Sequence, residues 1–247
     1  MTISVITAAL NCRQDLIRTR DSVLRQRGVK IQHIVVDGGS TDGTRELLAE
    51  WAADEHFRFV SETDTGVYDA FNKGLRLADG DYIGFLNAGD IYQNSDVLSD
   101  IALALADAGT DLVFGDVDMT PLDDLATTVR RYRAKNFLPQ HLLRGFMPPH
   151  PSIYVRRSAF DLVGEFCTEF RIAGDFEWAI RAFMLRKLGS RYLGKIVVRM
   201  PVGGISNDGF GSMWRNTIEM HRALRLHALP ASWIRLISRL PRKWLSR

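Results

Sequence analysis

Two short acidic segments follow apolar runs in the first half of the chain. Residues 37–42 have the sequence Asp-Gly-Gly-Ser-Thr-Asp, and residues 87–90 have the sequence Asn-Ala-Gly-Asp. Ligands bind at the carboxyl edge of the strands in an α/β sheet, so two strands with such ends would surround one crevice. Mg²⁺ prefers one or two carboxylates together with phosphate oxygens and water. The pattern therefore predicts a crevice for a nucleotide held by a divalent cation, Mg²⁺ or Mn²⁺.

Each acidic segment also has a purely structural interpretation. Asp37 could accept a hydrogen bond from a base or ribose, because the Gly38-Gly39 pair lets the main chain approach a ligand, or it could close an Asx turn. Asp90 could bind the cation, or it could belong to a capped turn before a helix that starts near Ser95. The residues alone leave both alternatives open.

The elements that would position these groups alternate regularly over residues 1–116. Strands are expected at residues 3–9, 31–37, 57–61, 81–86 and 111–115, and helices at residues 14–27, 42–53, 67–78 and 95–107. Ser40, Thr41 or Asp42 could cap the helix at 42–53. Alternation of strands and helices implies right-handed crossovers and an α/β fold with a doubly wound, mostly parallel sheet.

The pattern loosens after Asp116. A short strand is expected near 128–132, followed by a loop that ends at 147–151, where three prolines exclude a regular helix. Further along, the sequence predicts a strand at 152–155, a helix near 175–187 and a β-rich segment at 192–200. We expect residues 117–210 to form a smaller acceptor half on the nucleotide half, within one domain that spans 1–210.

Four motifs in this order make the chain resemble the inverting family 2 glycosyltransferases with the GT-A fold. The motifs are residues 4–11, 36–44, 62–74 and 85–90. The likeness extends over residues 1–210 and is strongest to the short bacterial subgroup that builds exopolysaccharide repeat units, including colanic acid transferases. It implies a Rossmann-like nucleotide half and transfer of a hexosyl or deoxyhexosyl group from a nucleotide diphosphate sugar to an acceptor hydroxyl.

The resemblance also implies roles for single residues. Asp37 matches the nucleotide-binding aspartate of the family, and Asp90 matches the last aspartate of its metal-binding motif. Asn87 and Gly89 stand where many relatives carry acids, so metal binding would rest on Asp90 and the diphosphate. Asp175 matches the base that takes the proton of the acceptor hydroxyl. From its position at the start of a predicted helix, Asp175 could instead be a helix cap.

Further site residues follow from the same resemblance. The donor-binding set is Thr7, Asn11, Asp37, Gly39, Asp64, Tyr68, Asp69, Asn72, Lys73 and Asn87. An ordinary amphipathic helix is the alternative for 67–78, although it does not explain the acids at 62–64. A second tier that borders the acceptor or the diphosphate contains His150, Glu177 and Ser206. His150 could equally be structural, and Glu177 is a fallback base that should point away from Asp175 along a helix.

The positive charge of the chain lies at its C-terminal end. Residues 213–247 contain eight Lys or Arg and one acid, Glu219, so their net charge is +7. Because the whole chain has a net charge of +3, the other residues together carry −4. From Ser232 onward, apolar residues recur at helical spacing between arginines, which predicts a basic amphipathic helix. We expect the helical tail 211–247 to bind an anionic membrane surface. A homodimer helix and a lid on the core are the alternatives, and the local charge argues against nucleic acid.

Other features bound the location and the reaction class. Only Cys12 and Cys167 are present, the N-terminus has no signal-peptide pattern, and no apolar run could span a bilayer. We therefore expect a cytoplasmic protein, peripheral at the inner face of the cell membrane, whose acceptor is a polyprenyl-diphosphate-linked saccharide. A non-catalytic nucleotide-sugar-binding protein is one competitor. A sugar nucleotidyltransferase is another, but residues 8–12 lack the glycine-rich loop that it requires.

Overall fold

Four parallel strands form the centre of the fold. The structure is a computed structural model that describes residues 1–202 and 209–239. Strand β1 (Thr2–Ala9) lies between β2 (Lys30–Asp37) and β4 (Tyr82–Phe85), and β3 (Phe57–Ser61) pairs with the far side of β2. Their apolar runs are buried on both faces, as is typical of strands covered by helices on either side. Asp37 pairs with Ala9 and with Ser61, so three strand ends lie side by side.

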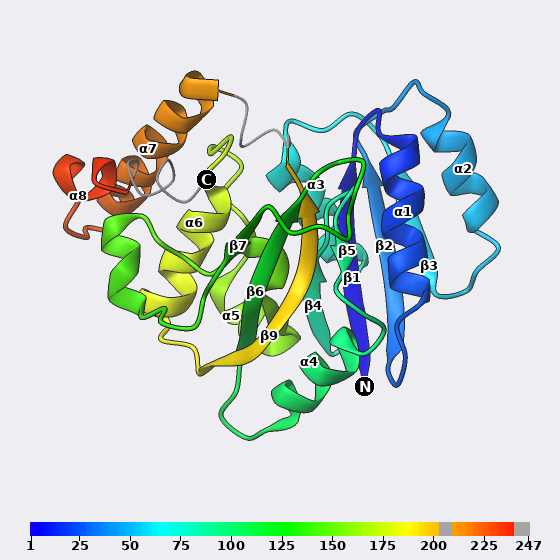
Figure 1. Cartoon of the computed structure of the whole chain (residues 1–247), viewed down its shortest axis with the longest axis horizontal. Helices are drawn as coiled ribbons and strands as arrows, with labels where there is room; N and C mark the ends of the chain where they lie inside the picture. The colour runs from blue at the N-terminus through cyan, green and yellow to red at the C-terminus, as the bar shows by residue number, and fades with distance from the viewer. Residues whose placement is uncertain (203–208, 240–247) are drawn as a thin grey trace.

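The second half of the chain extends the same sheet. β8 (Tyr154–Arg156) runs antiparallel between β4 and β6 (Leu112–Thr120), and β9 (Ser190–Pro201) pairs in parallel with β6. The short strands β5 (Ile91–Tyr92) and β7 (Arg130–Tyr132) are antiparallel to β9 and β6. Because β6 and β9 run in the direction of β1 to β4, the sheet is mostly parallel, and the predicted α/β fold is confirmed (Figure 1).

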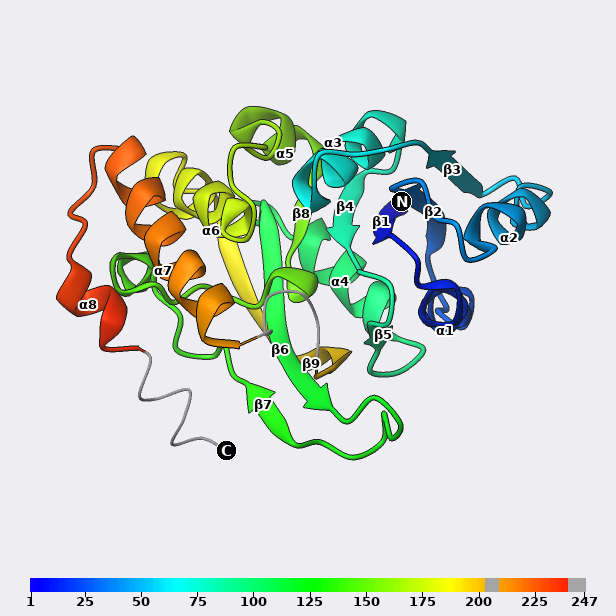
Figure 2. The same cartoon turned by 90° about the horizontal axis from the view of Figure 1, so that it is seen from above.

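Helices flank both faces of the sheet. They are α1 (Arg13–Leu24), α2 (Thr44–Trp51), α3 (Val67–Leu77), α4 (Val97–Ala106), α5 (Arg157–Val163) and α6 (Gly174–Ala179), with the π-helical turn η3 (Ile180–Leu185) after α6 and the 3₁₀ helices η1 (Pro139–Arg144) and η2 (His150–Ser152). Figure 2 shows α3, α5 and α6 on one side of the sheet and α1 and α4 on the other. The first of these layers covers an aromatic core that includes Phe71, Phe85, Phe160 and Phe166.

Several predicted boundaries differ from the structure by one to three residues, and two of these differences have a clear local cause. The strand predicted at 152–155 begins only at Tyr154, because Pro149 and Pro151 favour the 3₁₀ turn η2 before it. The Ser152 hydroxyl stabilises the end of this turn by donating to the Pro149 carbonyl at 2.7 Å. Helix α2 begins after Gly43, which has a φ of 85°. Of the three predicted caps, Asp42 accepts a hydrogen bond from the Thr44 N–H at 3.2 Å.

The C-terminal helices share the core of the sheet. α7 (Gly209–Leu226) packs against α6, and α8 (Trp233–Ile237) packs against α7 and η1. Their buried side chains, which belong to the same cluster as Phe176, are Met220, Ala223, Leu224 and Leu236. The helix predicted from Ser232 onward ends at Ile237, and Ser238 and Arg239 form a turn. The rest of the predicted segment, 240–247, lies outside the described residues. Within 1–202 and 209–239, no helix has both the length and the apolar character needed to cross a membrane.

Candidate functional site

The turn after β2 is built around the carboxylate of Asp37. This side chain is fully buried, and it accepts hydrogen bonds from the Ser40 N–H at 3.1 Å, the Ser40 hydroxyl and the Ser61 hydroxyl at 2.6 Å. Asp37 therefore closes the Asx turn that the structural alternative anticipated. It also ties the end of β2 to the end of β3. This turn fixes the main chain at the edge of the sheet where a nucleotide would lie.

Three segments that are distant in sequence converge on this turn. Asn11, at the end of β1, accepts a hydrogen bond from the Thr41 N–H at 2.9 Å through its side-chain oxygen. Gly38 lies so close to Asp64 that a Cβ atom there would be 2.6 Å from Asp64 Oδ2. Gly39 has a φ of 90°, a conformation that favours glycine. The structure thus brings Asn11, Gly39 and Asp64 together around the end of β2, as a shared site requires.

A cavity of about 390 Å³ opens beside these segments. Such a volume is within the usual range for small-molecule sites. Its walls are the N-terminus of α3 and the loop before α6, with the lining residues Asp64, Thr65, Gly66, Tyr68, Asp69, Thr168, Glu169, Phe170 and Arg171. Three of the predicted donor-binding residues, Asp64, Tyr68 and Asp69, therefore line one cavity.

Two other predicted residues organise the α3 N-terminus. Asp69 accepts a hydrogen bond from the Thr65 N–H at 3.0 Å, and this bond, followed by the charge of Lys73, lowers the pKa of Asp69. Lys73 donates to the Thr63 carbonyl at 3.0 Å and pairs with Glu62 at 3.0 Å and with Asp69 at 3.5 Å. Lys73 is thus engaged in holding the segment before α3. A phosphate that reached Lys73 would compete with these two carboxylates.

A hydrogen bond connects α3 with α6. The Tyr68 hydroxyl donates to the Ile172 carbonyl at 2.5 Å and lies 3.1 Å from Asp175 Oδ1. Asp175 Oδ1 also accepts from the Phe176 N–H at 2.8 Å. Burial, followed by the negative charge of Asp175, raises the pKa of Tyr68 well above its usual range, so Tyr68 remains a donor. A Cβ atom at Gly174 would be 2.7 Å from the Tyr68 ring, so glycine is required for this packing.

The N-terminus of α6 is capped by a residue from α7. The carboxylate of Glu219 accepts hydrogen bonds from the N–H groups of Arg171 at 3.1 Å, Ile172 at 2.8 Å and Ala173 at 2.9 Å. These are main-chain donors that a helix start leaves unpaired. Glu219 therefore fixes the turn that precedes Asp175. The sequence analysis missed this residue as part of the site, although its being the only acid in 213–247 was a signal.

His150 packs against the aromatic core. Its ring stacks on Phe71 and Phe85 with centroid distances of 5.3 Å to each. Burial lowers the pKa of His150, and the charge of Asp175 opposes that shift, so the imidazole is neutral at pH 7. Its Nε2 atom is buried and has no hydrogen-bond partner within the described part of the chain. His150 thus leaves one polar atom unpaired within the aromatic core.

The turn after β4 contains the predicted metal residue. Asp90 is buried, and burial raises its pKa to about 8, an effect that the Asn87 N–H opposes. The side-chain oxygen of Asn87 is buried without a partner among the described residues. Gly89 has a φ of 98°, so an acid at that position would be strained. Over 1–202 and 209–239 no group of three or more His, Cys, Asp or Glu could hold a metal.

One carboxylate and one unpaired amide oxygen nevertheless fit a particular kind of cation site. Mg²⁺ and similar ions often bind through one or two carboxylates and complete their coordination with substrate phosphates and water. Asp90 and Asn87 lie in one turn, where the Asp90 N–H donates to the Asn87 carbonyl at 3.0 Å. This turn follows β4, one strand away from β1 and two from Asp37. At a strand spacing of about 4.8 Å, the two turns are roughly 10 Å apart.

Two predicted donor-binding residues are occupied by contacts within the fold. Thr7 is buried, and its hydroxyl donates to the Leu86 carbonyl at 2.7 Å. Asn72 is buried, and its amide makes two hydrogen bonds of 2.9 Å with the main chain of Phe166. Thr7 therefore joins β1 to the turn that carries Asn87, and Asn72 joins α3 to the loop after α5. Both side chains therefore stabilise the segments around the site through contacts within the fold.

Glu177, the fallback base, is engaged in contacts within the fold. Glu177 is buried, and its carboxylate accepts from Arg181 at 2.8 Å and lies 2.7 Å from His227, which follows α7. Glu177 therefore contributes to the contact between α6 and the turn after α7. Ser206 lies outside the described residues.

Two sequence comparisons show which proteins this chain is similar to. The sequence model of glycosyl transferase family 2 matches residues 4–163. A PGL/p-HBAD biosynthesis glycosyltransferase of Mycobacterium bovis BCG is 31% identical over 98% of this chain and 90% of that protein.

Solved structures show the same fold. TarS 1-349 of S. aureus in complex with UDP-GlcNAc has a TM-score of 0.71 and 16% identity over 91% of this chain. The mannosyltransferase PcManGT of Pyrobaculum calidifontis, in complex with GDP-Man and Mn²⁺, has a TM-score of 0.67 and 19% identity over 92% of this chain. This chain spans 66% and 64% of the length of these two, and 42% of a longer TarS chain.

Proposed function

Because this chain belongs to glycosyl transferase family 2, we propose that it is an inverting, metal-dependent enzyme that moves a hexosyl or deoxyhexosyl group from a nucleotide diphosphate sugar to an acceptor hydroxyl. The observation that carries the proposal is the contact between Tyr68 and Asp175. It joins a wall of the cavity to the helix that begins at the candidate base. Donor and acceptor must meet at such a junction for transfer to occur.

In the proposed reaction, Asp175 acts as the general base. Its Oδ1 atom is held by Tyr68 and by the Phe176 N–H, and Oδ2 accepts no hydrogen bond from the described residues. Oδ2 would take the proton of the acceptor hydroxyl. The acceptor oxygen then bonds to the anomeric carbon on the face opposite the diphosphate. The bond from that carbon to the diphosphate breaks, and the configuration inverts.

The donor would lie along the ends of β1 to β4. We assign the nucleoside to the turn shaped by Asp37, with contacts from Asn11, Gly39 and Asp64. The sugar would enter the cavity beside Tyr68 and Asp69. Three nucleotides bound by the structural relatives, UDP, UDP-GlcNAc and GDP-Man, have a diphosphate in common, which supports a nucleotide diphosphate donor here.

A divalent cation, Mg²⁺ or Mn²⁺, would be held by Asp90 and the side-chain oxygen of Asn87. When bound, it would neutralise the charge that develops on the departing diphosphate. The Mn²⁺ present with one structural relative supports this choice of ion. The unpaired Asn87 oxygen and the buried Asp90 carboxyl are the features of this chain that favour it.

We propose a lipid-linked saccharide as the acceptor, carried on a polyprenyl diphosphate during assembly of exopolysaccharide, capsule or O-antigen. Residues 213–247 would hold the enzyme at the cytoplasmic face of the membrane. Their charge supports this, and so do the exposed aromatic residues Trp214 and Trp233, whose rings stack at a centroid distance of 6.4 Å. Tryptophan is enriched where proteins meet the membrane interface.

The replacement Asp175→Asn tests the proposed function. The variant keeps the size of the side chain but cannot accept the proton, so nucleotide diphosphate release in the presence of metal and lipid-linked acceptors should fall about 10²- to 10⁴-fold. Donor binding, measured by calorimetry, should stay within about twofold of the parent.

Asp161→Asn is the matched control, because Asp161 is exposed on α5 and has no partner in the described chain. It should retain full turnover. Unchanged release by Asp175→Asn would remove Asp175 as the base. Absence of release by the parent from every donor tested would favour the non-catalytic binding protein.

A further inference from the structure

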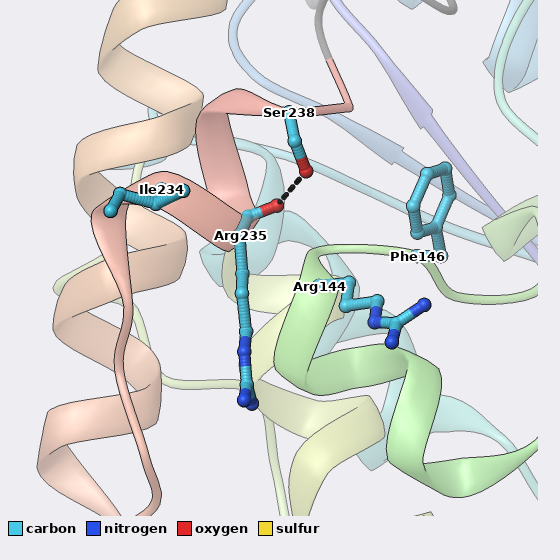
Figure 3. A pocket seen from close by; sticks show the side chains of 5 residues that line it. All are labelled: Arg144, Phe146, Ile234, Arg235 and Ser238. Atoms are coloured by element: carbon cyan, nitrogen blue, oxygen red, sulfur yellow. Dashed lines mark hydrogen bonds between the residues drawn. The ribbon is translucent and has the colours of Figure 1, made fainter.

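A second cavity, of about 300 Å³, lies between η1 and α8. Its lining residues are Arg144, Phe146, Ile234, Arg235 and Ser238. Figure 3 shows that Arg144 and Phe146 come from the η1 side and Arg235 from α8, whose end is fixed when the Ser238 hydroxyl donates to the Arg235 carbonyl at 2.8 Å. Two arginines from separate elements therefore face one opening. We name this cavity the arginine cleft.

We propose that the arginine cleft binds the phosphate group of the lipid that carries the acceptor. The inference rests on the proposed function, because it presupposes a lipid-linked acceptor. It adds the chemistry by which this chain would recognise the lipid. Its ligands would be Arg144 and Arg235 at the opening and Arg239 behind it.

The two arginines at the opening lack anionic partners. Arg144 and Arg235 are exposed, and neither forms an ion pair with any residue of 1–202 or 209–239. On α7, Arg222 is paired with Glu169, whereas the exposed Arg215 and Arg225 form no ion pair in the described part of the chain. A guanidinium presents a fork of N–H donors that matches phosphate oxygens. Two unpaired guanidinium groups on one cleft are therefore suited to a phosphate.

Arg239 adds a buried cation beside the cleft. It follows Ser238 and packs on Gly145, where a Cβ atom would be 3.1 Å from Arg239 Cδ. Arg239 is 5% exposed, its Nη2 atom donates to the Thr217 hydroxyl at 3.1 Å, and its Nε atom is buried without a partner among the described residues. A buried cation with no anion is costly. An anion in the arginine cleft would offset that cost.

The surroundings of the cleft favour an anion on an apolar chain. Phe146 and Ile234 line it, and Ile234 is 83% exposed. Trp233 continues this apolar surface, with 41% of its surface exposed, and its ring stacks on His221 at 4.0 Å. A free inorganic ion would make no use of these side chains. A lipid phosphate would contact the arginines, and its hydrocarbon chain would contact the apolar surface.

Helix α7 connects the arginine cleft with the proposed base. α8, which carries Arg235, packs against α7, and Arg239 donates to the Thr217 hydroxyl of α7. Glu219, two residues further along α7, caps the turn that precedes Asp175. A phosphate in the arginine cleft would therefore lie beside the helix that positions the proposed base.

The test measures binding of the full chain to phosphatidylcholine vesicles that contain either polyprenyl phosphate or, at equal surface charge, oleate. Sedimentation gives the partition constant without any sugar donor. Arg144→Gln/Arg235→Gln changes two exposed residues and should preserve the fold. Its matched control, Arg215→Gln/Arg225→Gln, removes the same charge from exposed positions on α7 and measures the loss due to general attraction to a charged surface. Arg144→Gln/Arg235→Gln should weaken binding to the polyprenyl phosphate vesicles at least tenfold more than this control does.

Three outcomes would overturn the proposal. Equal losses in the two double variants would show general attraction to a charged surface, worth about 1 kcal/mol per basic residue. Equal binding of the parent to oleate and to polyprenyl phosphate would show no phosphate recognition. Equal affinity for inorganic phosphate in solution would exclude the lipid as the source. This binding measurement uses no sugar donor, so it is independent of the turnover test. Absence of transfer activity would contradict the proposed function without changing the result for lipid binding.

Discussion

Tyr68 is the residue on which the geometry of the proposed base depends. Its hydroxyl reaches Asp175 across a sequence separation of 107 residues. Tyr68→Phe removes a hydroxyl that is shared between the Ile172 carbonyl and Asp175. A hydrogen bond to a charged group is worth about 1.5–3 kcal/mol. If that bond orients Asp175 in the transition state, turnover should fall roughly 10- to 100-fold while donor affinity changes little.

Tyr82→Phe is the control for this prediction, because Tyr82 is also buried and its hydroxyl contacts only the Met1 sulfur, at 3.5 Å. Steady-state turnover and calorimetric donor binding measure the two effects separately. A parallel loss of donor affinity in Tyr68→Phe would indicate that Tyr68 contacts the donor instead.

Asp90 gives the protein a pH dependence of defined sign. The pKa of Asp90 is about 8 in the folded chain, whereas its ordinary value, which applies to the unfolded chain, is 3.8. Between pH 3.8 and about 8, the folded chain therefore keeps a proton that the unfolded chain loses. Stability should therefore decline as pH rises from 3.8 to about 8. A cation bound as we propose would replace that proton, so the rise in Tm caused by Mn²⁺ should grow over this interval and disappear with EDTA.

Thermal unfolding of Asp90→Asn should show neither the decline nor the response to Mn²⁺. Asp123→Asn, at an exposed position with no partner in the described chain, should behave like the parent. A normal Mn²⁺ response in Asp90→Asn would place the metal elsewhere.

At the scale of elements, Glu219 makes the position of α6 depend on α7. Its carboxylate accepts three main-chain N–H groups. Glu219→Ala leaves these donors unpaired and should lower the free energy of unfolding by about 1–3 kcal/mol. Because Asp175 follows the released turn, turnover should also fall at saturating donor, with little change in the KM for the donor.

Glu219→Gln keeps one acceptor oxygen and should recover part of both losses. Glu50→Gln, exposed on α2, is the control. If the Glu219 variants lose stability but keep their turnover in buffer without denaturant, the cap would stabilise the fold without positioning Asp175.

The strands and the fold class could be predicted because their signals are local. The segments at 34–36 and 82–86 are predominantly apolar, and each is followed by residues that favour a turn. The sequence also predicted that the motifs at 36–44 and 62–74 would converge, and they do, at Gly38 and Asp64.

The partners of individual polar residues could not be predicted in this way. Asn72 matches a donor motif, yet its amide bonds the main chain of Phe166, 94 residues away. Glu219 caps a helix 46 residues earlier in the chain, at Ala173. Such contacts depend on how distant elements pack, and no periodicity within a segment encodes them.

At the scale of the whole molecule, the C-terminal helices should be needed for folding. A chain that ends at residue 208 loses the buried side chains of Met220, Leu224 and Leu236. At about 1.5–3 kcal/mol each, their burial contributes roughly 5–9 kcal/mol, which is comparable with the total stability of most domains. The shortened chain should bind a hydrophobic dye and lose its cooperative thermal transition.

Trp214→Ser/Trp233→Ser in the full chain provides the comparison, because both side chains are at least two-fifths exposed. This variant should unfold cooperatively near the Tm of the parent. Cooperative unfolding of the chain that ends at 208 would make 211–239 an independent appendage.

The capping of α6 by α7 has a geometric consequence for a membrane-bound enzyme. Trp214 and Glu219 lie on one helix, five residues apart, which corresponds to a rise of about 7.5 Å. If Trp214 lies at the bilayer surface, this rigid spacing sets the height of Asp175 above the lipid. Helix α7 would then act as a ruler that selects acceptors by the number of sugars between their lipid and the hydroxyl to be glycosylated.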